Sequence, residues 1–350
     1  MIIDKYFDMC IDRKASDLHI IPGFYPTIRI NNQISQLKVT ELITEEEAKN
    51  LALTLLNDQQ KEIFLSNKQI DFAYQYRNYR FRCNAYFTKN NIALAIRLLD
   101  SNIRTIEQLN LPPFFHDLTR YNQGLVLVTG PTGEGKSTTL ASLINEINIG
   151  QNKHIITIED PIEYVYPMGR SIISQRELYQ DTHSWTTALK AALREDPDIV
   201  LVGEMRDYDS IQLVLTIAET GHLVYSTLHT GSAAETISRI IDVFPSDQQT
   251  QVKMQLSSVL KAVVAQRLIP NFDGTGRIPA VEVLLNNSAV ATIIRDSRFQ
   301  MLPNVIATSE SEGMILFERY LMILLEKGLI SKETAMTYAF RSKEMEKLIK

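Results

Sequence analysis

The stretch GLVLVTGPTGEGKST at residues 124–138 decides the fold of this chain. An apolar run that predicts a strand leads into a glycine-rich turn, and a lysine with hydroxyl residues then opens a predicted helix. The glycines let the backbone bend and aim successive N–H groups at an anion. Lys136 adds a charge for the β- and γ-phosphates, and the Ser137 hydroxyl is placed to ligate Mg²⁺. The pattern predicts a nucleotide phosphate-binding loop at the positive end of a helix. The residues predicted to contact the nucleotide are Gly130, Pro131, Thr132, Gly133, Glu134, Gly135, Lys136, Ser137 and Thr138.

Length and composition narrow the class of protein. The 350 residues are enough for two domains with separate cores. The 36 basic and 41 acidic residues leave a net charge of −5, so no nucleic-acid partner is expected. Only Cys10 and Cys83 are present, which excludes a tetracysteine zinc site within one chain and favours a reducing cytosol. We find no secretory signal and no apolar run of about 18 residues, so no transmembrane segment is expected.

The pattern of residues predicts an α/β protein with a small α+β domain at 1–99, a linker and helix at 100–123, a nucleotide-binding core at 124–285 and a helical region at 286–350. In the first domain, a capping box at 44–47 predicts the start of a helix. Alternating polar and apolar segments there predict an antiparallel meander at 69–76, 79–88 and 92–99.

From residue 124 onwards, apolar strands alternate with helices, which indicates a doubly wound parallel sheet. The strands are expected at 124–129, 154–158, 199–202 and 223–227, and the helices near 136–149, 184–195, 207–220 and 232–243. A further strand pair is expected at 263–269 and 278–285.

Carboxylates follow two of these strands, at the sheet edge where ligands of such folds gather. Glu204 ends the run 199–204 as a Walker B acid would, facing Mg²⁺ or its waters. Glu159, Asp160 and Glu163 follow the strand at 154–158. Glu163 is proposed as the general base, with the other two in the outer shell of the metal. A solvated acidic loop is the alternative reading of this cluster.

Two histidines bracket the strand at 223–227. At strand rise His222 and His229 lie about 23 Å apart, so they do not share one phosphate or one metal. His229, at the carboxyl end, is a candidate sensor of the γ-phosphate. His222 is expected to make structural or interface contacts, and a purely structural role is the alternative for either.

Arginines on the predicted meander form another candidate group. Arg80 and Arg82 lie two apart and hence on one face of a strand, and Arg97 ends the next strand. Arginines that only decorate the surface are one interpretation of this group. The other is that in an assembled ring such a face could reach a neighbour's γ-phosphate, where an arginine is worth about 10³–10⁵ in rate. Arg194 and Arg206, which flank the Walker B strand, are further candidates.

Taken together, the segments 130–138, 159–164, 193–207 and 219–230 resemble the Walker A, Asp box, Walker B and His box of PilT-type motor ATPases, in family order. These motors belong to the type II secretion and type IV pilus ATPase superfamily. The resemblance covers nearly the whole chain. It implies a PAS-like N-terminal domain and a RecA-like ATPase domain, with ATP and Mg²⁺ as cofactors.

The resemblance also implies a function: a cytoplasmic homohexameric ring at the inner-membrane base of a pilus, where hydrolysis powers pilus retraction. The implied partners are a PilC-like platform protein of the inner membrane and a second motor ATPase of the same system. It assigns Glu163 as catalytic glutamate, Glu204 as Walker B carboxylate, and His222 and His229 as the His box. Arg80, Arg82 and Arg97 fall where the family places its arginine contacts.

Three departures from the family pattern affect this interpretation. Glu134 stands where the family usually has serine; pointed outward it is harmless, but pointed inward it would weaken nucleotide binding. Ser226 replaces a glycine in the His-box strand. The retraction motors' AIRNLIRE motif is AVATIIRD at 289–296, without its first arginine, which makes the accessory PilU-type motor a serious relative.

Other functions remain as alternatives to retraction. Assembly-type motors of the superfamily carry a tetracysteine zinc module that two cysteines do not supply. A RecA-like DNA translocase would show basic or aromatic stretches that track a strand. A nucleotide-binding scaffold without hydrolysis would leave the carboxylates idle.

Overall fold

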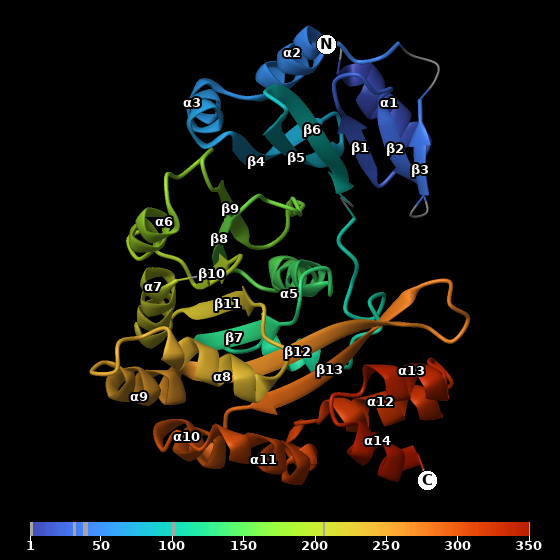
Figure 1. Cartoon of the computed structure of the whole chain (residues 1–350). Coiled ribbons are helices and arrows are strands. Elements are labelled where there is room, and N and C mark those ends of the chain that lie inside the picture. Colours follow the sequence, from blue (N-terminus) through green and yellow to red (C-terminus); the bar gives the residue numbers. More distant parts are fainter. Residues whose placement is uncertain (1–2, 31–32, 38–40, 100–101, 206, 350) are drawn as a thin grey trace. The chain divides into compact units, whose positions relative to one another are not determined.

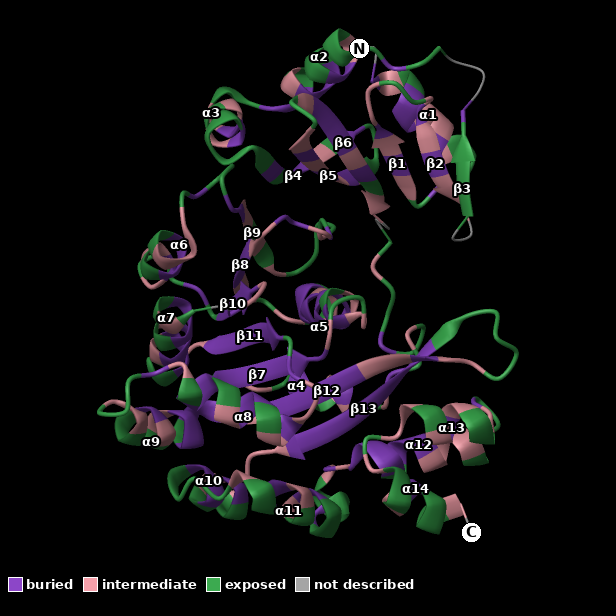
Figure 2. Cartoon of the chain, viewed as in Figure 1, coloured by how far each residue is buried: buried purple, intermediate pink, exposed green. Residues whose placement is uncertain are grey.

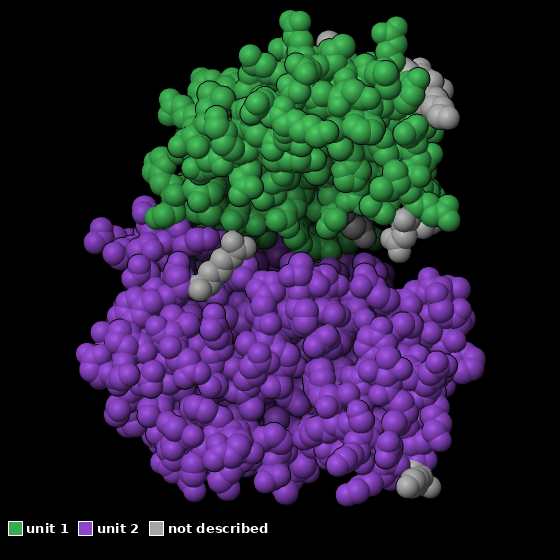
Figure 3. Space-filling model, viewed as in Figure 1, with its two compact units in different colours: residues 1–103, 158–165, 175–184 green, residues 104–157, 166–174, 185–350 purple. Residues whose placement is uncertain are grey.

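The structure, a computed structural model, describes residues 3–30, 33–37, 41–99, 102–205 and 207–349 (Figure 1). The contacts divide the chain into two compact units (Figure 3). Unit 1 comprises Met1–Ile103, Ile158–Val165 and Gln175–Ser184, and unit 2 comprises Arg104–Thr157, Tyr166–Ser174 and Trp185–Lys350. Unit 1 thus takes in two segments that the sequence pattern places in the 124–285 core. The predicted domain limits themselves stay predictions.

Unit 1 is built on a six-stranded antiparallel sheet with the strand order β3-β2-β1-β6-β5-β4. Its elements are α1 (Asp4–Asp12), β1 (Asp17–Ile20), β2 (Thr27–Ile30), β3 (Gln33–Gln36), α2 (Glu45–Leu55), α3 (Asp58–Asn67), β4 (Gln69–Tyr76), β5 (Tyr79–Thr88) and β6 (Asn91–Leu99). The expected meander is confirmed as β4, β5 and β6. The predicted cap is also confirmed, because the Glu47 N–H donates to the Thr44 hydroxyl at 3.1 Å.

Aromatic rings fill the core of unit 1. Phe7 of α1 is fully buried, and its ring centroid lies 4.3 Å from that of Phe81 and 5.6 Å from that of Tyr74. Such pairs add about 0.5–1.5 kcal/mol each beyond the area that they bury. The amphipathic helix α1 is therefore held on the sheet by contacts with two neighbouring strands.

The remaining elements continue from the linker. They begin with α4 (Phe115–Leu118), β7 (Gly124–Thr129), α5 (Lys136–Gly150), β8 (His154–Glu159), β9 (Ile172–Glu177), α6 (Trp185–Ala192), β10 (Ile199–Val202), α7 (Tyr208–Glu219), β11 (Leu223–Leu228), α8 (Ala233–Asp242) and α9 (Gln249–Val259). They end with β12 (Leu260–Pro270), β13 (Arg277–Leu285), α10 (Ser288–Arg295), η1 (Phe299–Met301), α11 (Leu302–Thr308), η2 (Glu310–Glu312), α12 (Phe317–Glu326), α13 (Lys332–Tyr338) and α14 (Ser342–Ile349).

The second sheet has the order β13-β12-β7-β11-β10-β8-β9. Strands β10, β11, β7 and β12 pair in parallel, and β13 is an antiparallel edge strand on β12. All residues of β7, β10 and β11 are buried (Figure 2). Strands that are buried throughout need cover on both faces, which confirms the predicted α/β architecture. The short edge strand β9 is an element that the hydrophobic pattern did not predict.

Most helices of this architecture pack on the sheet through alternate strand residues. Val126 and Val128 of β7 share a core with Leu140 and Leu143 of α5 and with residues of α12. Helix α7 contacts β7 and β11, and α8 contacts β12 and β13. In the described part of the chain, no helix is long and apolar enough to cross a membrane.

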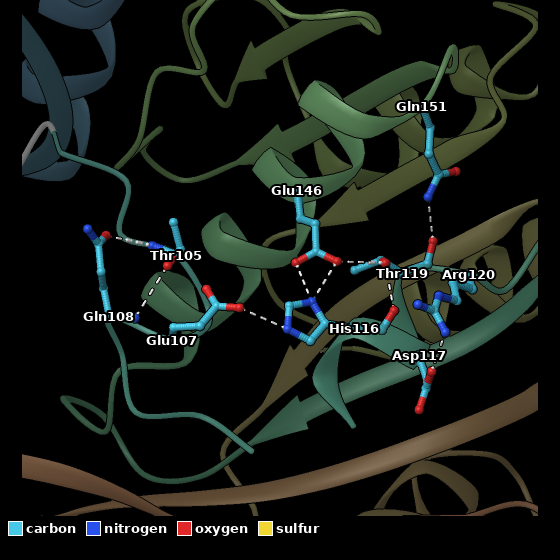
Figure 4. Close-up of polar contacts among 9 residues, drawn as sticks. All are labelled: Thr105, Glu107, Gln108, His116, Asp117, Thr119, Arg120, Glu146 and Gln151. Atoms are coloured by element: carbon cyan, nitrogen blue, oxygen red, sulfur yellow. Dashed lines mark hydrogen bonds and ion pairs between the residues drawn. The ribbon is translucent and has the colours of Figure 1, made fainter. Parts of the chain in front are cut away.

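A histidine joins the linker to the helix that follows the glycine-rich loop (Figure 4). His116 of α4 contacts Glu146 of α5 through Nδ1 at 2.8 Å and Glu107 through Nε2 at 3.0 Å. Thr119 donates its hydroxyl hydrogen bond to Glu146 at 3.2 Å. In the linker, Thr105 and Gln108 form the two reciprocal hydrogen bonds of a capping box, and a turn follows them in place of a helix.

The position of His116 predicts a pH-dependent part of stability. The hydrogen bond with Glu146 is the main cause that raises the pKa of His116 above its ordinary value of 6.5. A raised pKa means that the imidazolium stabilises the fold fully below about pH 6.5, and that this contribution is lost as pH rises through the folded-state pKa. We expect His116→Gln to lower the melting temperature more at pH 6 than at pH 8.5. Equal losses at both values would contradict this role.

Candidate functional site

The glycine-rich loop between β7 and α5 adopts a shape that only its glycines allow. Gly130, Gly133 and Gly135 have φ angles of 147°, 82° and 78°, in the left-handed region. A Cβ atom at Gly130 would also collide with the backbone oxygen of Gln266 in β12. Any other residue at this position would move the loop away from the neighbouring strand.

The backbone of the loop itself holds Lys136 in place. Lys136 is 8 % exposed, and its ammonium donates to the carbonyl oxygens of Gly130 at 2.7 Å and Pro131 at 3.0 Å. Ser137, the next residue of α5, is exposed at the first turn of the helix. The first turn of an α-helix has N–H groups without intrahelical partners, which makes it suited to an anion.

Three predicted elements meet at the carboxyl end of the sheet in unit 2. His229, after β11, lies 3.0 Å through Nε2 from Oε1 of Glu204, which follows β10. The other ring nitrogen, Nδ1, lies 3.5 Å from the hydroxyl of Thr132 in the loop. His229 thus spans the gap between a loop hydroxyl and the predicted Walker B carboxylate. The role of His229 as a sensor of the γ-phosphate stays a prediction.

His222 lies at the amino end of β11, where its Nδ1 is 3.0 Å from the carbonyl oxygen of Ile217 in α7. Because Leu223 pairs with Gly124 and Leu228 with Thr129, β11 and β7 point the same way, and His222 is at the far end from the loop. Within unit 2, His222 therefore does not lie near the glycine-rich loop. Its assignment to the nucleotide site remains a prediction.

The serine that departs from the family pattern in β11 is accommodated by hydrogen bonding. Ser226 is fully buried, and its hydroxyl donates to the carbonyl oxygen of Val202 in β10 at 2.8 Å. The next residue repeats this contact, with Thr227 donating to Gly203 at 2.6 Å. The substitution adds a link between the two strands and leaves no buried hydroxyl unpaired there.

In unit 1, Arg80 is held by its own chain. Its Nη2 lies 2.6 Å from Oε2 of Glu177, and its Nε donates to the carbonyl oxygen of Ile162 at 2.8 Å. Glu177 is 1 % exposed and also accepts from the backbone N–H groups of Ala73 and Ile162. Arg80 therefore ties the acidic segment 158–165 to the sheet of unit 1. This contact explains why the segment is counted with that unit.

The two other arginines of the predicted group lie side by side on the same sheet. Arg82 of β5 pairs directly with Arg97 of β6, and Arg97 contacts Asp17 at 2.9 Å. Arg82 lies 3.9 Å from Oε1 of Glu163, whose side chain is 33 % exposed. Both arginine side chains are well exposed, at 40 % and 65 %. Each also has a carboxylate of its own chain nearby, since Arg97 is held by Asp17 and Arg82 lies 3.7 Å from Asp71, so a role in binding an anion stays a prediction.

The remaining acidic and basic candidates have less defined surroundings. Glu159 accepts from the side-chain amide of Gln175 at 3.3 Å, within unit 1, and Asp160 follows it in the chain. Arg194 is exposed in the turn after α6. Arg206 lies outside the described residues. The roles of these side chains in nucleotide chemistry stay predictions.

Sequence reasoning missed two groups that support these residues. Glu177 holds Arg80, and the end of β12, at Gln266 and Leu268, contacts the loop at Glu134. All of these contacts join residues about a hundred or more positions apart, so no local pattern marks them.

Comparisons with known proteins agree on one family. The family model described as type II/IV secretion system protein matches residues 1–311. A twitching motility protein of Neisseria gonorrhoeae is 44 % identical over 321 residues, 91 % of this chain and 86 % of that protein. The type IV pilus ATPase PilU of Pseudomonas aeruginosa is 37 % identical over 351 residues, 100 % of this chain and 92 % of that protein.

A solved structure extends this likeness to the fold. The crystal structure of the pilus retraction motor PilT with bound ADP is 41 % identical and superposes with a TM-score of 0.90, covering 98 % of each chain. The predicted family and fold class are confirmed: the chain belongs to the type II/IV secretion system protein family and is an ATPase of that family.

Proposed function

We propose that this chain is the motor ATPase that retracts a type IV pilus. The observation that carries the proposal is the likeness over almost the full chain to a twitching motility protein and to the pilus retraction motor PilT. The geometry of unit 2 supports it, because His229 lies between the loop and Glu204. In such a motor, ATP hydrolysis would drive a change of conformation that performs mechanical work on the pilus.

Nucleotide binding would use groups that the loop already presents. The phosphates of ATP would replace the carbonyl oxygens of Gly130 and Pro131 as partners of Lys136. Glu163 would accept the proton of the attacking water as general base. Arg82 and Arg97 would offer their exposed guanidinium groups to a neighbouring subunit's γ-phosphate.

The residues at the loop fit a magnesium ion. The exposed Ser137 hydroxyl and the Glu204 carboxylate are the oxygen ligands that Mg²⁺ accepts beside water and phosphate oxygens, with Glu204 acting through a water. When bound, the ion would neutralise charge that develops on the phosphates. His229 would hold the Glu204 carboxylate in position through its 3.0 Å contact.

The assembly and location follow from the same proposal. Six copies would form a ring in the cytoplasm, against the inner membrane at the base of the pilus. A PilC-like platform protein would receive the motion, and a second motor ATPase of the system would share the task. The side chains of Arg82 and Arg97 are 40 % and 65 % exposed, which supports contacts of these two arginines with a neighbouring subunit.

An accessory role in the same system is the second candidate. The 37 % identity to PilU over the whole chain favours it, together with the altered motif at 289–296. Helix α10 carries this motif, and Arg295 is its remaining arginine. Loss of the first arginine would weaken a contact with the platform protein but leave hydrolysis intact.

A pilus count in cells that carry Lys136→Ala tests the proposal. We expect abundant surface pili that fail to withdraw in a twitching assay, because assembly would continue without retraction. Lys61→Ala is the matched control, since Lys61 makes only an exposed ion pair with Asp58. Cells without pili would assign the chain to assembly, and unchanged pili would assign it to the accessory role; either result would overturn the retraction proposal.

A further inference from the structure

Glu134 lies in the phosphate-binding loop, where a carboxylate that pointed inward would repel the phosphates of a nucleotide. Its side chain points toward β12 instead. Oε2 accepts a short hydrogen bond from the backbone N–H of Leu268 in β12. The backbone oxygen of Glu134 accepts from the side-chain amide of Gln266 at 2.7 Å. The side chain is 18 % exposed. Glu134 is therefore anchored on the neighbouring strand by two separate hydrogen bonds.

The end of β12 has donors available for this anchor. The pairing of β12 with β7 ends at Ala265 opposite Thr129, while β12 itself continues to Pro270. Beyond that point β7 has given way to the loop, so the N–H of Leu268 has no carbonyl of β7 to meet. A buried N–H group without a partner is costly, and the Glu134 carboxylate fills the place of the missing strand.

Arg267 supplies a charge of opposite sign beside the anchor. Its Nη1 lies 3.9 Å from Oε1 of Glu134, and its guanidinium lies over the ring of Phe340 at 5.4 Å from the centroid. Among the described residues, its Nε is buried and has no hydrogen-bond partner. The Arg267 side chain is 32 % exposed, and the ring contact with Phe340 keeps its guanidinium near the carboxylate.

We propose that Glu134 and Arg267 form a positioning pair that sets the affinity of the loop for nucleotide. The hydrogen bond to Leu268 pins the loop against β12, and Arg267 neutralises the carboxylate that this anchor requires. The ATP affinity of the chain would therefore depend on an arginine that lies 133 positions after Glu134 in the sequence. The inference rests on nucleotide binding at the loop and is independent of the pilus assignment.

The sign of each effect follows from the charges. Without Arg267, the Glu134 carboxylate would repel the phosphates, and ATP would suffer more than ADP because it carries one more negative charge. We expect Arg267→Gln to raise the KM for ATP and the Kd for ADP by about threefold to tenfold, the range usual for charges in direct coupling. Added salt would reduce this effect, since screening weakens partly exposed charges.

A double-mutant cycle on the purified chain tests the pair. We would measure kcat and KM for ATP, and the Kd of ADP by calorimetry, for Arg267→Gln, Glu134→Gln and the double variant. In the Glu134→Gln background the arginine substitution should change the Kd by less than about twofold, because no carboxylate remains to neutralise. An equal fold-change in both backgrounds would show that Arg267 affects nucleotide binding independently of Glu134, and would overturn the pairing.

A second comparison isolates the anchor. Glu134→Gln keeps an amide oxygen that accepts from the Leu268 N–H, whereas Glu134→Ala does not, and both variants are neutral. We expect the alanine variant to bind ADP more weakly than the glutamine variant. Equal affinities would exclude the anchor. Arg319→Gln is the control for an exposed arginine, because Arg319 contacts Glu310 away from the loop.

Discussion

The Lys136→Ala protein should bind nucleotide weakly and hydrolyse ATP about 10³-fold more slowly than the parent. The ammonium of Lys136 is buried and aimed into the loop by two carbonyl oxygens, so its charge acts where little water screens it. Removing one such charge-stabilising group from an active site costs about 10²–10³ in rate. The loss of ground-state binding adds to this figure. Steady-state hydrolysis by the purified protein, over a range of ATP concentrations, measures both parts.

The fold should survive this substitution. Alanine is shorter than lysine and leaves space in which a water molecule can donate to the carbonyl oxygens of Gly130 and Pro131 in place of the ammonium. A melting temperature near that of the parent would separate a chemical defect from unfolding, and Lys61→Ala gives the background for an ordinary lysine. Hydrolysis within about threefold of the parent would show that phosphate binding does not depend on the ammonium.

The sequence was sufficient to predict the loop and the strands around it, because both are local patterns. The run 124–138 contains its strand, glycines, lysine and helix start within one short segment. The expected strands at 199–202 and 223–227 match β10 and β11 within a residue. A continuous apolar run between turn signals marks a strand that is buried on both faces.

Contacts between distant segments were beyond this kind of prediction. Glu177 is a polar residue in a polar edge strand, and its partner Arg80 lies 97 positions earlier. The local sequence around Glu177 or around Arg80 contains no pattern that would predict this ion pair. The same holds for β9, whose sequence IISQRE has too few apolar residues to signal a strand by itself. The assignment of 158–165 to unit 1 follows from these contacts and from no local pattern.

The orientation of Glu134 shows the same limit on a smaller scale. The residue pattern allows a carboxylate that points toward the phosphates or away from them. The structure selects the outward orientation because β12 ends with an available N–H at Leu268. That N–H is available because β7 stops at Thr129, which is a property of the sheet and not of the loop.

Glu163→Gln should abolish most hydrolysis while leaving nucleotide binding nearly intact. The glutamine side chain has the same shape and lacks the basic oxygen, so it removes general-base catalysis, which contributes about 10²–10⁴ in rate. Glu163 is 33 % exposed, and its contact with Arg82 is long at 3.9 Å, so the substitution disturbs little structure. A fall in kcat with a Kd for ATP close to that of the parent is the expected result.

This separation of kcat from affinity distinguishes Glu163 from Lys136, whose loss should affect both. Glu62→Gln is a suitable control, because Glu62 is an exposed glutamate of α3. If Glu163→Gln hydrolyses ATP as fast as the parent, the acidic segment is a solvated loop and the general base must be sought elsewhere. If kcat falls but pili in cells carrying the variant still withdraw, a second motor supplies the force. The first result would contradict the proposed chemistry of Glu163, and the second would contradict the proposed coupling of its hydrolysis to pilus retraction.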